Sequence, residues 1–151
     1  MTTKPHPTGL EFLRCNPRPD QERCNDDAVR AICLALDLDY WLVYYELEKV
    51  RERASASYVE GQWQVDRAKR AGLLAPKLME AYLSKYGWQR TVLPEGTRFY
   101  AEHLPPRCIA EQATHFVCVR NGAVWDSWDS RGKRWKKLRA YYAPLNPAVF
   151  P

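Results

Sequence analysis

The chain has 151 residues, 46% of them hydrophobic and 27% charged, and its formal net charge is +5. These values are typical of a soluble globular protein, and the absence of any apolar run near ~20 residues argues against a membrane-spanning helix. The opening residues MTTKPHPTG contain no apolar signal region, which favours synthesis in the cytosol, and the five cysteines include no CxxC pair. We expect reduced thiols, an extended N-terminal arm over 1–23 and a single domain over 24–151.

The first helix is expected over 26–36. Asn25 is the expected N-cap, and Asp26 and Asp27 follow it where the helix dipole stabilises negative charge. The apolar face of this helix contains Ala28, Val29, Ile32, Cys33 and Leu36.

Two further helices are expected in the first half of the chain. One covers 40–53, and the other begins at Pro76 and ends at Gly87, a residue that favours helix termination. Between them, residues 54–72 are polar and mixed, with a short helix expected around 65–71. The apolar stripes contain Tyr40, Val43, Tyr44, Leu47 and Val50 in the first of these helices, and Met79, Tyr82, Leu83 and Tyr86 in the second.

The second half of the chain has the pattern of strands. Candidate strands are 88–93, 107–110, 115–120, 123–128 and 138–143. Helices followed by strands predict an α+β fold, with the N-terminal helices packed on a short antiparallel sheet.

The stretch THFVCVRNGAVWDSWD, residues 114–129, is the most informative in the sequence. Asn121 and Gly122 lie between two alternating runs and predict a two-residue hairpin turn, because both turn positions need a positive φ. Such a turn brings His115 near Asp126 on the same face of the two strands. A carboxylate beside an imidazole selects one tautomer and stabilises the protonated ring, as in Cys-His-Asp hydrolases.

Asp129 is an alternative carboxylate for His115. The hairpin register pairs 115 with 128, which places Asp126 diagonal to His115 and turns Asp129 to the opposite face. We therefore favour Asp126, and we expect Trp128 to lie opposite His115 and to shield the pair from water.

Cys24 is the candidate nucleophile, since it immediately precedes the first helix, where the dipole and a nearby imidazolium lower a thiol pKa. Gln21 or the backbone amides of 25–27 would then form the oxyanion hole. Cys33 is a poor candidate because it lies on the buried helix face. The alternative for Cys24 is a small apolar filler, and for His115 a structural histidine bonded to Asp126.

The sequence resembles the small papain-like, peptidase-like proteins encoded by tailed bacteriophages. That family has a helix beginning near NDCVVRALA, a following YxxVYxxL helix and a late HxxAVxDGxxxDTWD hairpin. The matching segments here are NDDAVRAIC at 25–33, DYWLVYYEL at 39–47, YLSKYGW at 82–88 and HFVCVRNGAVWDSWD at 115–129. The resemblance covers roughly 22–130, and it implies a papain-like fold and a cysteine-peptidase ancestry.

The chain departs from that family at one position. When the NDCVVRALA segment is aligned, Asp27 occupies the place of the catalytic cysteine. At a helix N-terminus this carboxylate is expected to have a lowered pKa and to cap the dipole. Two functions therefore stay open: a thiol hydrolase of amide or isopeptide bonds that uses Cys24, His115 and Asp126, and a catalytically inactive module that binds a protein. The resemblance implies the cytoplasm of an infected bacterium, or the virion, as the location.

Two other kinds of site are weaker predictions. His103, Cys108, His115 and Cys118 match no standard zinc spacing, so we expect neither a metal nor another cofactor. The run RGKRWKK would allow contact with nucleic acid, although a solvated loop is the simpler interpretation. Its basic residues are Arg131, Lys133, Arg134, Lys136 and Lys137.

Overall fold

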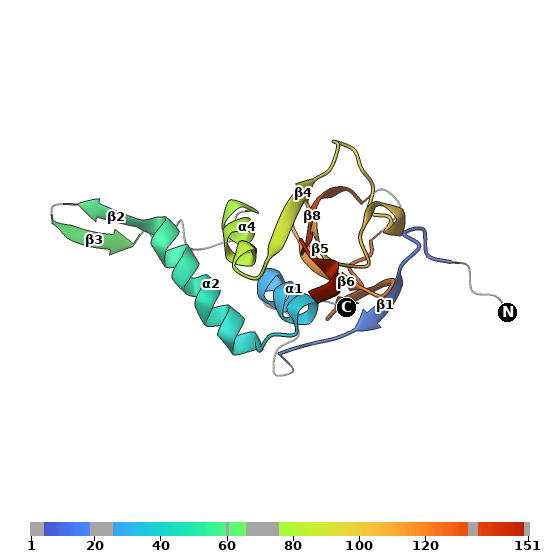
Figure 1. Ribbon diagram of the computed structural model, residues 1–151, viewed down its shortest axis with the longest axis horizontal. Helices are drawn as coiled ribbons and strands as arrows, with labels where there is room; N and C mark the ends of the chain where they lie inside the picture. The colour runs from blue at the N-terminus through green and yellow to red at the C-terminus, as the bar shows by residue number, and fades with distance from the viewer. Residues whose placement is uncertain (1–4, 19–25, 60, 66–75, 133–135, 150–151) are drawn as a thin grey trace.

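The computed structural model describes residues 5–18, 26–59, 61–65, 76–132 and 136–149 (Figure 1). Within these residues the fold is α+β, as predicted, with three α helices and a six-stranded mixed sheet. The helices are α1 (Asp27–Leu36), α2 (Tyr40–Ser55) and α4 (Pro76–Ser84). In order across the sheet, the strands are β1 (Glu11–Arg14), β7 (Ala123–Asp126), β6 (Phe116–Arg120), β5 (Arg107–Gln112), β8 (Leu138–Pro144) and β4 (Trp88–Val92).

The sheet is mixed, which corrects the expectation of an antiparallel one. Strand β1 lies in the N-terminal arm and pairs in parallel with β7, whereas every other pairing in this sheet is antiparallel. The four residues of β1 are too few to show a strand period, and a parallel partner 112 positions away (Glu11 with Ala123) leaves no local signal.

A second departure lies in the polar stretch after α2. Residues 56–65 contain a small two-stranded sheet, β2 (Ala56–Val59) and β3 (Gln62–Val65), in which Val59 pairs with Gln62. Val65 therefore ends a strand, and the rest of the helix expected around 65–71 lies outside the described residues. Figure 1 shows this hairpin at the far end of α2, projecting from the body of the molecule.

Two apolar clusters pack on opposite faces of the large sheet. The expected apolar faces of the three helices lie in the first cluster, together with Trp88, Ile109, Phe116, Cys118 and Tyr142. The second cluster contains Leu10, Phe99, Cys108, Ala110, Val117, Val119, Val124 and Leu138. Figure 1 shows α1 and α4 on one side of the curved sheet and the segment that follows β4 on the other.

Helix ends are set by local backbone geometry. Helix α1 ends at Leu36 and is followed by Asp37, whose φ of 56° is left-handed, and the amide of Leu38 donates to the carbonyl of Cys33. Gly87 follows α4 with a φ of 76°, as expected of its terminating residue. The N-cap of α1 is Asp26 rather than Asn25, which lies outside the described residues, and the Asp26 side chain makes no capping hydrogen bond.

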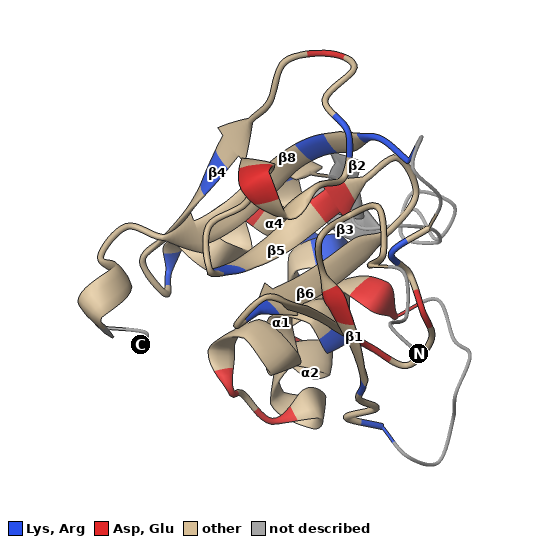
Figure 2. Ribbon diagram, turned by 90° about the vertical axis from the view of Figure 1, so that its right-hand side faces the viewer, with Lys and Arg blue, Asp and Glu red and all other residues tan. Residues whose placement is uncertain are grey.

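The Asp26 carboxylate instead holds a buried polar network. It accepts hydrogen bonds from Arg30 Nε at 2.7 Å and from the Tyr40 hydroxyl at 2.5 Å. Arg30 also donates to Asn16 of the N-terminal arm at 2.5 Å, and the Arg18 guanidinium lies 4.8 Å from the Trp41 ring centre. This network therefore ties the arm to the start of both helices. Figure 2 shows that acidic and basic residues are otherwise interspersed over the ribbon.

No helix among the described residues is long and apolar enough to cross a membrane.

Candidate functional site

The hairpin of β6 and β7 forms as predicted. Asn121 and Gly122 have φ values of 52° and 75°, and Arg120 pairs with Ala123 across the turn. Both positive φ values are those of a type I′ turn, which suits the twist of paired strands. The strands are shorter than expected, since β6 begins at Phe116 and β7 ends at Asp126. His115 thus stands just before the first residue of its strand.

The register brings the predicted histidine and aspartate into contact. His115 Nε2 lies 2.7 Å from Asp126 Oδ2, and the two side chains are only 12% and 7% exposed. The amide of Ser127 donates to the other carboxylate oxygen of Asp126 at 2.8 Å. Because both of its oxygens have partners, the Asp126 carboxylate is held in one orientation and fixes the imidazole ring.

Asp129 takes no part in this pair, in agreement with the expected register. Its oxygens accept hydrogen bonds from Arg131 Nε and Nη2 at 2.8 and 2.7 Å. Trp128 covers the pair, with its ring centre 5.1 Å from that of His115, and it stays 47% exposed. The Lys136 ammonium lies 5.6 Å from the Trp128 ring centre, and burial lowers the pKa of this lysine.

A second carboxylate, that of Asp27, faces the other nitrogen of the ring. Asp27 Oδ2 lies 3.5 Å from His115 Nδ1 and accepts a hydrogen bond of 2.8 Å from the Phe116 amide. The expectation that Asp27 simply caps its own helix is therefore incomplete. The first residue of α1 joins the helix to the start of β6 and completes a carboxylate–imidazole–carboxylate row, Asp27–His115–Asp126.

The two carboxylates determine the charge of His115. Burial alone would lower its pKa, but the hydrogen bonds and charges of Asp126 and Asp27 raise it from 6.5 to about 9. The ring is therefore an imidazolium at neutral pH, with both N–H groups directed at carboxylates. A neighbouring thiolate would also hold the ring protonated, so the charge of His115 shows an anionic partner at Nδ1, and the identity of that partner decides the chemistry.

This raised pKa predicts a pH-dependent stability. The folded state binds the His115 proton more tightly than the unfolded chain, so the stabilisation is complete below pH ~6.5 and is lost as the pH rises through about 9. We expect the contribution of His115 to the free energy of unfolding to fall by about 3 kcal/mol between pH 6 and 10. Urea unfolding at a series of pH values measures it. The His115→Gln variant should show a flatter profile, and an equally steep one would contradict this assignment.

The remaining predicted catalytic residues, Cys24 and Gln21, lie outside the described residues. Cys33 is buried, as expected, and burial raises its pKa to about 12. Cys15 was not predicted to lie near the site, but its backbone amide donates a hydrogen bond of 2.8 Å to the Asp126 carbonyl. Burial raises the pKa of Cys15 as well, and the same holds for Cys108 and Cys118. No described cysteine therefore carries a lowered pKa.

The two cysteines considered as zinc ligands, Cys108 and Cys118, lie on opposite faces of the sheet. Cys118 belongs to the apolar cluster on the helix side of the sheet, and Cys108 belongs to the cluster on the other side. Within the described part of the chain, no group of three or more suitable side chains could hold a metal ion.

The basic run is only partly described. Lys133 and Arg134 lie outside the described residues. Arg131 donates to Asp129 and to the Leu10 carbonyl, and Lys136 donates to the Ser130 carbonyl. These contacts turn both side chains toward the protein.

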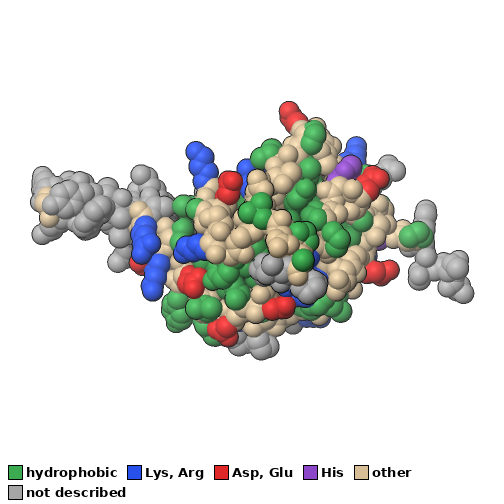
Figure 3. Space-filling view, in the orientation of Figure 1, with side chains coloured by type: hydrophobic (Ala, Val, Ile, Leu, Met, Phe, Trp, Pro, Cys, Tyr) green, Lys and Arg blue, Asp and Glu red, His purple; other side chains and the backbone are tan. Residues whose placement is uncertain are grey.

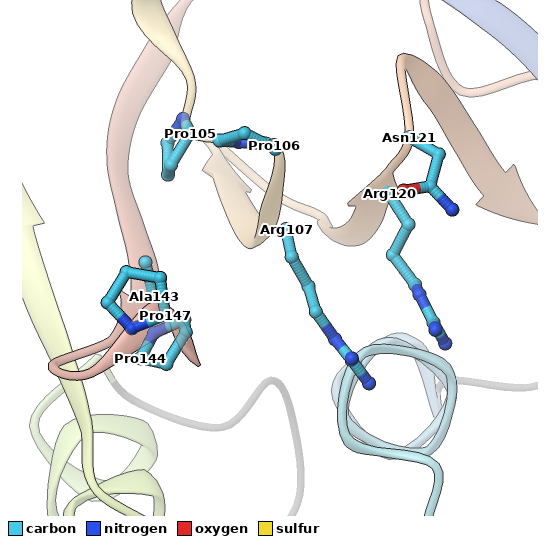
Figure 4. Close-up of a pocket in the computed structure, with 8 residues that line it drawn as sticks. All are labelled: Pro105, Pro106, Arg107, Arg120, Asn121, Ala143, Pro144 and Pro147. Carbon is cyan, nitrogen blue, oxygen red and sulfur yellow. The ribbon is translucent and has the colours of Figure 1, made fainter. Parts of the chain in front are cut away.

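A cavity of about 250 Å³ lies at the opposite end of β6 (Figure 4). Its lining is mostly apolar and comprises Pro105, Pro106, Arg107, Arg120, Asn121, Ala143, Pro144 and Pro147. Figure 4 shows both arginine side chains running toward the end of a helix. They donate there to the carbonyls of Ala35 and Leu34 and to the carboxylate of Asp37. Their aliphatic stems therefore line the cavity, while their charged ends hold the C-terminus of α1.

Comparison with models of protein families, with curated proteins and with solved structures gives no match for this chain.

Proposed function

We propose that this protein is a catalytically inactive, papain-like module that acts by binding another protein. The observation that carries the proposal is the Asp27 carboxylate at 3.5 Å from His115 Nδ1, while Asp126 holds Nε2. A thiol hydrolase presents a thiolate to one nitrogen of its histidine and a carboxylate or amide to the other. In this chain a second carboxylate takes the place of the thiolate.

This substitution preserves the electrostatics of such a site and removes its chemistry. Asp27 supplies the negative charge that a thiolate would supply, so the imidazolium stays buried and paired. The Asp27 carboxylate is engaged by the Phe116 amide and by His115, and a carboxylate is a much weaker nucleophile toward an amide carbonyl than a thiolate. The row of charges therefore stabilises the junction of α1 with β6 and β7 without a nucleophile.

The resemblance to phage proteins supports the setting of the proposal, an infected bacterial cell or a virion, where the partner would be a host or virion protein. Nucleic acid is the less favoured partner, because Arg131 and Lys136 are directed at the protein itself.

A thiol hydrolase using Cys24 is the second candidate, and the observation that favours it is the intact 2.7 Å bond between His115 and Asp126. In that case the Cys24 thiolate would attack the carbonyl carbon of an amide or isopeptide bond, with Gln21 stabilising the oxyanion. His115 would then return the proton to the departing amine.

Alkylation of the natural protein with iodoacetamide at pH 6 separates the two candidates. The inactive module predicts that no cysteine reacts preferentially, because an ordinary thiol with a pKa of about 8.5 is almost fully protonated at that pH. Stoichiometric labelling of Cys24 that is lost in His115→Ala would contradict the proposal and support the hydrolase. Asp27→Asn is the matched control, since it keeps the shape of the site and removes only the second carboxylate.

A further inference from the structure

We propose that the free edge of strand β4 is where this protein binds its partner, and that the partner contributes an extended segment that pairs antiparallel with β4. In that segment, acidic residues precede the residues that pair. The inference rests on the proposed protein-binding function, but it does not depend on the charge of His115. It is carried by the hydrogen-bonding pattern of β4 and by the basic residues beyond the end of this strand.

Strand β4 is the last strand of the large sheet, beside β8. The Leu93 amide donates to the Arg139 carbonyl of β8 at 3.0 Å. Because alternate residues of a strand bond to opposite sides, the backbone groups of Arg90 and Val92 point away from β8. No backbone hydrogen bond from these outward groups reaches another described residue. Such a row of open donors and acceptors is a template for one more strand.

The outer strand at the other side of the sheet, β1, is less open. The carbonyl of Leu10, just before β1, already accepts a hydrogen bond of 3.0 Å from Arg131 Nη1. At the end of β4, Thr91 and Val92 are both exposed, and Val92 is 67% exposed. Figure 3 shows hydrophobic side chains over the region where Figure 1 draws β4 and the loop that follows it. An exposed valine on an open edge offers apolar contact to an added strand.

Three exposed basic side chains lie beyond the end of β4. Arg98 and Lys137 are directly opposite each other in an antiparallel bridge, and Arg139 is two residues further along β8, ~7 Å away. Figure 2 shows basic residues on both segments at the start of β8. Like charges directly opposite each other destabilise a strand pair. Among the described residues, no acidic side chain pairs with Lys137 or Arg139. An acidic ligand would therefore neutralise this corner.

The charges select both the occupant and its direction. Strand β4 runs toward the basic corner, so an antiparallel segment enters from that corner and its acidic residues come first. A second copy of this chain fits less well, because pairing β4 with itself about its central residue would place Arg90 opposite Arg90. Nucleic acid would satisfy the cations, but it lacks the alternating amide and carbonyl groups that bond to a strand edge.

Amide hydrogen exchange in the natural chain tests the edge directly. The probe is a synthetic peptide of three glutamates followed by alternating threonines and valines. Saturation with this peptide should slow exchange of the Arg90 and Val92 amides at least about tenfold. The Leu93 amide, already bonded to Arg139, should keep its rate. Equal protection of all three amides, or of none, would overturn the proposal. Protection that rises with protein concentration in the absence of peptide would identify a second copy as the occupant and would also overturn it.

Peptide affinity tests the basic corner. A peptide with three lysines in place of the glutamates should bind at least about tenfold more weakly. Lys137→Glu should weaken binding of the glutamate peptide about three- to thirty-fold, because a favourable charge contact becomes a repulsive one. Lys49→Glu makes the same change on an exposed part of α2 and should leave the affinity unchanged. Equal affinities in either comparison, or tighter binding of single-stranded DNA than of the glutamate peptide, would contradict the proposal.

A proline at the edge tests the added strand. Val92→Pro removes an outward N–H without breaking a bond to β8, so it should weaken binding at least about tenfold. Val92→Thr keeps the N–H and should bind nearly as well as the natural chain. If both variants bind equally well, the segment does not pair with β4. Alkylation of Cys24 bears on the proposed function alone, so the failure of one proposal can be told from the failure of the other.

Discussion

Replacing Asp27 by cysteine is expected to create a reactive thiol at a position where the natural protein has none. The new side chain would stand at the first position of α1, beside Nδ1 of a histidine whose Nε2 is held at 2.7 Å by Asp126. A helix N-terminus and an imidazolium lower thiol pKa values to about 3.5–7.5, against about 8.5 for a free cysteine. Alkylation by iodoacetamide at pH 6 should therefore be at least about tenfold faster than for an ordinary thiol.

The control for this result is the double variant Asp27→Cys with His115→Ala, which keeps the helix N-terminus and removes the imidazolium. Its thiol should react more slowly at pH 6 and approach the single variant above pH 9. Asp27→Ser corrects for the natural cysteines, since it adds no thiol. If the single and double variants react at the same rate at pH 6, then residue 27 is not coupled to His115 as the structure indicates.

Removal of the Arg30 side chain is expected to have the largest effect on stability. Arg30 and Asp26 are 6% and 7% exposed, and they pair at 2.7 Å. The Arg30→Ala variant leaves a buried carboxylate that keeps the Tyr40 hydroxyl but loses its paired guanidinium. Breaking a buried pair in this way costs about 3–5 kcal/mol, because the remaining charge is uncompensated. The free energy of unfolding in urea measures the loss.

The matched control is Arg51→Ala on α2. Arg51 pairs with Glu48 at 3.3 Å, and these side chains are 18% and 30% exposed, so the pair is better solvated. Its loss should cost about 1 kcal/mol or less. Equal losses in the two variants would show that burial does not make the Asp26–Arg30 pair exceptional.

Local patterns predicted the hairpin and the helix faces well. The Asn121–Gly122 turn fixes the register of β6 and β7 through two residues, and that register alone implies the contact between His115 and Asp126. The apolar face of α1 is likewise a matter of helical period, and all five of its predicted residues are buried.

Contacts between distant segments were not predictable in the same way. Strand β1 depends on a partner more than a hundred residues away, and its four residues carry no period of their own. Strands β2 and β3 were not predicted because each has only four residues, although Gln62–Val65 does alternate between polar and apolar residues.

The position of Asp27 illustrates the same limit at the site. Sequence alignment with the phage proteins placed it at the nucleophile position, but its contacts with the Phe116 amide and His115 depend on how α1 packs against β6. The sequence alone predicted a helix cap. The Asp26–Arg30 pair has a local signal, the i,i+4 spacing of opposite charges, although that spacing does not reveal that the pair is buried.

The charge of His115 is the central claim, and an NMR titration of its imidazole nitrogens tests it most directly. The chain contains three histidines, and the His115→Gln variant identifies the relevant signals. We expect both ring nitrogens to be protonated at pH 7.5 and the titration midpoint to lie near the raised pKa of about 9. A midpoint at or below the ordinary value of about 6.5, with one unprotonated nitrogen at pH 7.5, would contradict the account, since the two carboxylates would then not stabilise the imidazolium.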